Sequence, residues 1–179
     1  VPLPALGSYN HEAVAVDPEQ RRLYLTEDRS TGNFYRFTPT TWGDLSEGLL
    51  EVAMPPMSQV SWAPVPNPNP ASNETSTRNQ VPGALRFNGG EGIVWQSGIV
   101  HFTTKGDNRV WRYEPRAETI EIVYQYNLDP ALQLSGVDNI TASRAGDLLV
   151  AEDPGNLELV LLTPDCFASP LVRVTGQAG

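Results

Sequence analysis

The chain has very little cysteine and histidine: its 179 residues include one Cys, Cys166, and two His. A single cysteine cannot form an internal disulfide, and two histidines without cysteine partners do not make a structural zinc site. The sequence also lacks any run of about 18 apolar residues, the length that a membrane-spanning helix needs. We therefore expect no membrane span and no zinc-stabilised module.

Basic residues are also few, with 12 Lys and Arg against 21 Asp and Glu and a formal net charge of −9. The bases are scattered singly, so they form no positive patch for DNA or RNA, and the overall charge repels phosphate backbones. The sequence therefore predicts that the chain does not bind nucleic acid. A metal bound by so acidic a chain should be a hard cation with oxygen ligands.

Turn-forming residues are abundant, with 15 Gly and 16 Pro, and 40% of the residues are hydrophobic. Short runs of four to six β-forming residues alternate with Gly, Asp, Asn and Pro, and no window of helical length has a clean 3.6-residue period. A chain of this size can bury a real core as one domain. The sequence predicts an all-β domain over residues 1–179.

A threefold repeat organises these runs. Each copy has an acid that opens a short strand, a second strand that ends in an acidic turn, a third strand closed by Pro, and a fourth apolar run. Four consecutive antiparallel strands, repeated along a chain, are typical of a β-propeller blade. We predict twelve strands in three four-stranded blades. The predicted blades lie near residues 11–54, 90–126 and 137–175.

The spacing of the copies is uneven, since Glu12 and Glu91 are 79 positions apart whereas Glu91 and Asp138 are 47 apart. The excess falls in the Pro- and Asn-rich segment 55–89, which we interpret as an inserted loop over one face; a disordered linker between two domains is the alternative. Three blades do not close a ring, because propellers have about four to eight. We expect part of a six-bladed ring, completed by further blades of a longer chain or, as the alternative, by a second copy.

Eight acids should lie at one mouth of the channel, because the first strand of a blade begins where the second strand ends. Together they need a neutralising cation, and calcium, Ca²⁺, accepts six to eight oxygen ligands. The strand-opening Glu12, Glu91 and Asp138 are the first candidate metal ligands, and Glu27 and Glu152 are the next. The alternative for these three strand-opening acids is that they are solvated strand ends. For Asp28, Asp107 and Asp153, the favoured interpretation is that they cap Asx turns.

Other candidate chemistry is limited. Lys105 lies at the same mouth and is the candidate contact for an anionic substrate, with an ordinary surface lysine as the alternative. His101, between Val100 and Phe102, is expected to be a core histidine. Cys166 has no basic neighbour that would activate it, and no Gly-x-Ser-x-Gly motif marks a nucleophile. The catalytic residues are therefore left unassigned.

The acid motifs resemble those of the PhoX-type alkaline phosphatase family, and the similarity covers nearly the whole chain. The matching stretches are Asn10-His11-Glu12-Ala13, Leu25-Thr-Glu-Asp28, Gly90-Glu91-Gly92, Gly136-Val-Asp-Asn139 and Ala151-Glu-Asp153. The resemblance implies the later half of a six-bladed propeller that bacteria export to the periplasm or beyond. It also implies an axial site with several Ca²⁺ and iron ions that hydrolyses phosphate monoesters, with Glu12, Glu91 and Asp138 at metal-binding positions.

Three functions follow from these features. The favoured one is a metal-dependent phosphatase acting on a small-molecule phosphate ester. The second is a non-catalytic module in which Ca²⁺ only holds the blades together and the Pro-rich loop binds a partner. The third is a calcium-dependent lactonase or esterase, because the propeller architecture also supports that chemistry.

Overall fold

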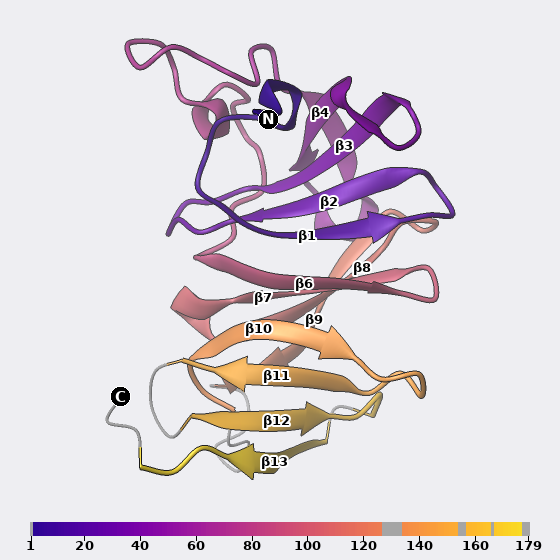
Figure 1. Ribbon diagram of the computed structural model, residues 1–179, viewed down its shortest axis with the longest axis vertical. Coiled ribbons are helices and arrows are strands. Elements are labelled where there is room, and N and C mark those ends of the chain that lie inside the picture. The colour runs from indigo at the N-terminus through magenta and orange to yellow at the C-terminus, as the bar shows by residue number, and fades with distance from the viewer. Residues whose placement is uncertain (1, 127–133, 154–156, 166, 177–179) are drawn as a thin grey trace.

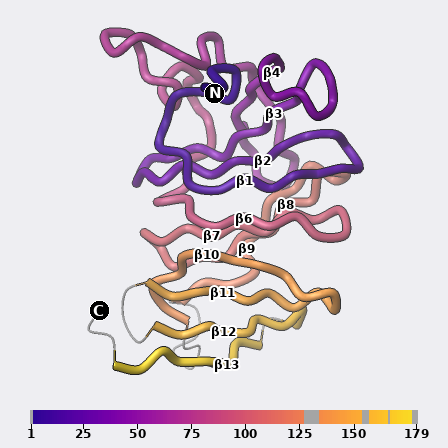
Figure 2. Tube along the Cα trace, in the orientation of Figure 1, coloured from indigo at the N-terminus to yellow at the C-terminus, as the bar shows by residue number. Residues whose placement is uncertain are grey.

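A computed structural model describes residues 2–126, 134–153, 157–165 and 167–176. These residues form three antiparallel sheets, and in each sheet the strands are paired in chain order. The sheets follow one another in space as they do in sequence, from the indigo N-terminal sheet to the yellow C-terminal sheet (Figures 1 and 2). The predictions of an all-β fold and of one sheet for each repeat are confirmed.

Each sheet is a simple meander. The first contains β1 (His11–Asp17), β2 (Arg22–Glu27), β3 (Phe34–Thr41), β4 (Asp44–Met54) and β5 (Ser61–Pro64). The second contains β6 (Gly90–Gln96), β7 (Ile99–Thr104), β8 (Arg109–Glu114) and β9 (Thr119–Gln125). The third contains β10 (Val137–Ala142), β11 (Leu148–Glu152), β12 (Glu158–Leu162) and β13 (Ala168–Arg173).

Four single 3-10 turns lie wholly within the described residues. They are η1 (Pro4–Leu6), η2 (Met57–Gln59), η3 (Thr77–Asn79) and η4 (Lys105–Asp107). Within the part of the chain that is described, no helix is long and apolar enough to cross a membrane.

The segment 55–89 is not purely the inserted loop that the sequence predicts, because β5 pairs with β4 as a fifth strand. Prolines in this segment argue against a sheet, but Pro64 is tolerated since it lies at the end of an edge strand. Val65 and Ala84 from the same segment are buried in one cluster with Leu25 and Phe37 of the first sheet. The insertion and the N-terminal residues therefore cover one face of that sheet.

Aromatic side chains fill the space between the first and second sheets. Phe34 of β3 stacks on Phe102 of β7 with ring centroids 4.6 Å apart, and Tyr24 contacts Tyr113 edge to face at 5.3 Å. A separate aliphatic cluster, which includes Val110 of β8, joins the second sheet to the third. The second sheet is thus buried on both faces, as a middle blade should be.

The first strands of the three sheets, β1, β6 and β10, lie side by side and share one irregularity (Figure 1). In each strand the pairing register shifts near its beginning, so that two residues oppose one residue of the second strand. The bulged pairs are Glu12-Ala13 opposite Thr26, Glu91-Gly92 opposite Thr103, and Asp138-Asn139 opposite Ala151. Such bulges re-aim side chains, and here each one contains the strand-opening acid.

Candidate functional site

Glu91 lies at the centre of the acidic mouth, where β6 begins between the first and third sheets. Its side chain is almost fully buried, at 4% exposure. Burial and the nearby charges of Asp138, Asp28 and Glu12 raise the pKa of Glu91 whereas Lys105 lowers it, and together they bring it to about 7. A carboxyl group with this pKa changes its charge near neutral pH, which is characteristic of functional sites.

Lys105 lies among the acids rather than apart from them. Its Nζ is 3.3 Å from Asp138 Oδ2, 3.3 Å from Asp153 Oδ2 and 3.9 Å from Glu91 Oε1. The side chain keeps 36% exposure, so solvent reaches the ammonium group. In the metal-free protein, Lys105 therefore acts as the counter-ion of three carboxylates; its predicted contact with a substrate anion stays a prediction.

The strand register explains why Lys105 occupies this place. Counted from the bulge, Thr104-Lys105 of the second sheet corresponds to Glu27-Asp28 of the first and to Glu152-Asp153 of the third. The acid that follows, Asp107, instead lies in the β7–β8 turn, accepting from Thr104 Oγ1 at 2.5 Å and pairing with Arg109 at 2.9 Å. The sequence repeat alone does not distinguish the two positions, whereas the register does.

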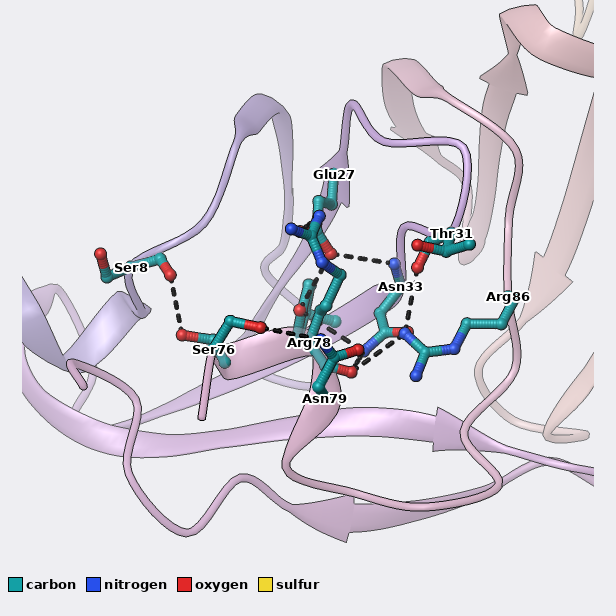
Figure 3. A network of polar contacts seen from close by, with 10 residues as sticks. Ser8, Glu27, Thr31, Asn33, Ser76, Arg78, Asn79 and Arg86 are labelled. Atoms are coloured by element: carbon teal, nitrogen blue, oxygen red, sulfur yellow. Dashed lines mark hydrogen bonds and ion pairs between the residues drawn. The ribbon is translucent and has the colours of Figure 1, made fainter. Parts of the chain in front are cut away.

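Glu27 points away from the mouth and into the first sheet, where it is 1% exposed (Figure 3). Its Oε1 accepts from Arg78 Nη1 at 2.9 Å, and its Oε2 accepts from the backbone N–H of Asn33 and from the hydroxyl of Tyr35, both at 3.1 Å. Both oxygens already have protein donors, so Glu27 is poorly placed to bind the metal predicted for it. Arg78 comes from the insertion, 51 residues away, and no local pattern points to this pair.

Glu152 occupies the equivalent position of the third sheet and is also buried, at 5% exposure. Its Oε1 accepts from the Ser135 N–H at 2.7 Å, while its Oε2 has no hydrogen-bond partner among the residues that are described. Burial raises its pKa, whereas the hydrogen bond from the Ser135 N–H lowers it. Strand alternation explains the arrangement, because Glu152 faces the sheet whereas the next residue, Asp153, faces the mouth.

The site therefore gathers five carboxylates, of which Glu91, Asp138 and Asp153 pair with the ammonium group of Lys105. They come from all three sheets: Glu12, Asp28, Glu91, Asp138 and Asp153. This set of hard oxygen donors matches Ca²⁺ in kind. Within the described ranges, however, no three Asp, Glu, His or Cys side chains are arranged to hold one metal ion. The ammonium of Lys105 lies between its acid partners, so a bound cation would have to displace it.

Among the described residues, His11 does not bring a nitrogen ligand to this cluster. His11 neighbours Glu12, but its Nε2 is within 3.0 Å of the carbonyl oxygen of Gly7 and its ring stacks on Tyr9. Cys166 lies outside the described residues. The carboxylate oxygens of the described residues are thus better suited to Ca²⁺ than to a metal that prefers nitrogen or sulfur.

Comparisons with known proteins agree with the geometry. No curated protein matches the chain. Fifteen chains of solved structures match it; one, from a crystal structure of a nidogen/laminin complex, is a β-propeller with 12% identity and a TM-score of 0.56. That alignment covers 92% of this chain and 49% of the other, so this chain spans about half the length of its structural neighbour, and the likeness concerns the fold alone.

The family comparison is more specific. A family model described as "Alkaline phosphatase PhoX" matches residues 1–178. The match includes all three sheets, the insertion and every acid of the mouth. The chain belongs to the PhoX alkaline phosphatase family.

Proposed function

We propose that this chain supplies half of a metal-dependent phosphatase that hydrolyses phosphate monoesters at the acidic mouth. Family membership supports a phosphatase-like function. The observation that carries the proposal is the position of Glu91, a buried carboxyl group with three further acids nearby, Glu12, Asp28 and Asp138, from both neighbouring sheets. A divalent cation is the natural neutraliser of such a cluster, and phosphate hydrolysis is among the reactions that such cations assist.

Glu91 and Asp138 are the proposed principal metal-binding residues, with Glu12, Asp28 and Asp153 able to complete the oxygen shell. When bound, Ca²⁺, with iron as a second candidate, would supply charge stabilisation and orient the phosphate group. Lys105 would then exchange its carboxylate partners for the phosphate oxygens, because the cation takes over their charge. Its solvent-exposed ammonium group is free enough to turn towards a substrate.

The remaining blades are proposed to pack on the outer face of the third sheet. Leu159 and Val172, which share that face, are 40% and 49% exposed. These apolar residues are paired across β12 and the edge strand β13, and a further blade would bury them. Those blades come, in this proposal, from a longer chain or from a second copy, and the complete protein acts in the periplasm or outside the cell, as in exported members of the family.

The direct test is phosphate release from p-nitrophenyl phosphate by the protein with its complete set of blades. We expect turnover that EDTA abolishes and that added Ca²⁺, alone or with iron, restores. Glu91→Gln should abolish it as well, whereas Glu47→Gln, an equivalent change at an exposed position of the first sheet, should not. Turnover that persists in EDTA, or no turnover by the folded and metal-loaded protein, would refute the proposal.

Two further measurements separate the alternatives. Elemental analysis of the purified protein identifies the metal: calcium with iron agrees with the phosphatase proposal, and a metal-free protein that stays folded contradicts it. A substrate panel that compares phosphate monoesters with lactones decides the reaction class. Hydrolysis of lactones without hydrolysis of phosphate esters would favour the lactonase, and a Ca²⁺-dependent rise in melting temperature without any hydrolysis would favour the non-catalytic module.

A further inference from the structure

A pocket lies between the second and third sheets, at the end of the strands opposite to the acidic mouth. It opens beside the β6–β7, β10–β11 and β12–β13 turns, the first two of which lie on the right in Figure 1. Its volume is about 390 Å³, within the range of small-molecule sites. Both of its walls belong to this chain, so the pocket does not depend on the blades that complete a ring.

The wall of the pocket is largely apolar. Ile99 and Val123 contribute from the second sheet, and Leu148 and Leu162 contribute from the third. The β6–β7 turn at its lip is a two-residue hairpin loop, Ser97-Gly98, with both residues at positive φ (49° and 84°). A loop of this conformation matches the twist of its strands and is well defined. The pocket is therefore built by regular structure and not by a long loop.

His101 of β7 lines this pocket with a ring that carries no charge. Its Nδ1 is buried and has no hydrogen-bond partner among the described residues. Burial, assisted by the charge of Arg112, lowers the pKa of His101 to about 4, so the ring is neutral at physiological pH.

Two arginines give the pocket its charge. Arg112 is paired with Glu114 and Glu121 at 2.9 and 3.0 Å, so its charge is already balanced. Arg144, in the β10–β11 turn, is exposed and makes no ion pair with any residue that the structure describes. Among the described residues, the rim of the pocket thus carries one positive charge that has no ion-pair partner, above an apolar wall.

We propose that this pocket binds a small amphipathic carboxylate. The apolar body would lie against Ile99 and Leu148, beside the neutral ring of His101, and the carboxylate would pair with Arg144. The combination of an apolar wall and an arginine that has no ion-pair partner among the described residues matches this class of ligand better than it matches a neutral or a cationic one. The site is separate from the proposed phosphatase site, since the two lie at opposite ends of β6 and β7.

Calorimetric titration with 2-naphthoate tests the proposal. We expect saturable binding with one site per chain, unaffected by EDTA, and binding of the neutral analogue 2-naphthamide about tenfold weaker, the equivalent of one modest ion pair. Arg144→Gln should weaken naphthoate about tenfold and leave naphthamide unchanged. The matched control Arg29→Gln, an exposed arginine at the opposite end of the first sheet, should change neither affinity.

A second variant tests the pocket itself. Ala145 is exposed at the rim, and Ala145→Trp should fill the opening and abolish binding of both compounds while circular dichroism shows a native sheet signal. The proposal is overturned if the wild-type protein binds no naphthoate at millimolar concentration. It is equally overturned if Ala145→Trp binds as well as wild type, or if Arg144→Gln and Arg29→Gln weaken binding to the same extent.

Discussion

Glu91 shows how one residue can link stability to pH. Because its pKa is raised to about 7, well above that of a carboxyl group in an unfolded chain, the folded state binds more protons between pH 4.5 and 7. Without metal, the free energy of unfolding should therefore fall as pH rises through 7, by roughly 1.4 kcal/mol per unit of pKa shift at most.

Glu91→Gln is the corresponding variant, because the amide keeps the shape of the side chain and removes its titration. In EDTA we expect the variant to lose most of the decline in stability between pH 5 and 8, and to be more stable than wild type at pH 8. Urea unfolding at several pH values measures this. Identical pH profiles for the two proteins would show that the charge of Glu91 is not the cause.

The titration of His101 should have the opposite effect on the pH dependence of stability. Its pKa is lowered to about 4, first by burial and then by Arg112, whereas an unfolded histidine titrates near 6.5. The unfolded state thus binds more protons between these values, and stability that is complete above pH 6.5 is lost as pH falls towards 4.

Replacing His101 by Gln should remove this loss, while His11→Gln, at the other and exposed histidine, should leave it in place. Thermal melts of the three proteins at pH 4.5, 5.5 and 7 provide the measurement. A wild-type melting temperature that tracks that of His101→Gln across the series would contradict the assignment.

Residue types and spacing in the sequence place Glu12, Glu91 and Asp138 at one mouth, and the structure brings them together. The role of Glu27 is not predictable in the same way, because its partner Arg78 is distant in sequence and reaches it only through the folded insertion. Lys105 illustrates a third case: its position follows from the strand register, and a single bulge decides that register. The sequence pattern thus predicts the positions that depend on the strand repeat, such as Glu91. It does not predict contacts between residues distant in sequence, such as the Arg78–Glu27 ion pair.

Among the elements, the bulged first strands do more than aim the acids. The hydroxyl of Thr26 on β2 donates to the carbonyl oxygen of Glu91 at 2.5 Å, and the hydroxyl of Thr103 on β7 donates to the carbonyl oxygen of Asp138 in the next sheet. The bulges of β6 and β10 thereby each expose a carbonyl group that the preceding sheet binds. The third sheet has Ala151 at the equivalent position, so it offers no such donor to a following blade.

Thr103→Val should break this connection between the second and third sheets, because Val has the same shape and no hydroxyl. The side chain is fully buried, so we expect a loss of about 1 to 3 kcal/mol in the free energy of unfolding. Thr103→Ser, which keeps the donor, should lose less. Urea denaturation compares them, and a Val variant as stable as wild type would show that the bond contributes nothing.

The insertion is held to the first sheet by the ion pair between Arg78 and Glu27 (Figure 3). Arg78→Met leaves a buried carboxylate without its cation, which typically costs about 3 to 5 kcal/mol. We expect the insertion to become sensitive to trypsin, cleaved at Arg86, before the sheets unfold. The double variant Arg78→Met with Glu27→Gln should regain much of the protection, since the uncompensated charge is gone; protection of the single variant equal to wild type would contradict this role.

At the scale of the molecule, the two ends of the sheet stack differ. The insertion covers the face of the first sheet that points away from the second, burying Val65 and Ala84. The outer face of the third sheet has no such cover in the described part of the chain, and Leu159 and Val172 remain exposed there. An uncovered apolar sheet face drives association. The outer face of the first sheet is therefore covered, whereas the outer face of the third sheet could pack against a further sheet.

This asymmetry predicts how the 179-residue chain behaves alone. We expect it to self-associate through the third sheet, and Leu159→Asp combined with Val172→Asp should shift it towards the monomer in sedimentation velocity runs at equal concentration. The control pair Val14→Asp with Val16→Asp adds the same charge at two comparably exposed positions of β1 and should leave association in place. A wild-type chain that is monomeric at high micromolar concentration, or a control pair that disperses it equally well, would show that the third sheet is not the surface on which the next blade packs.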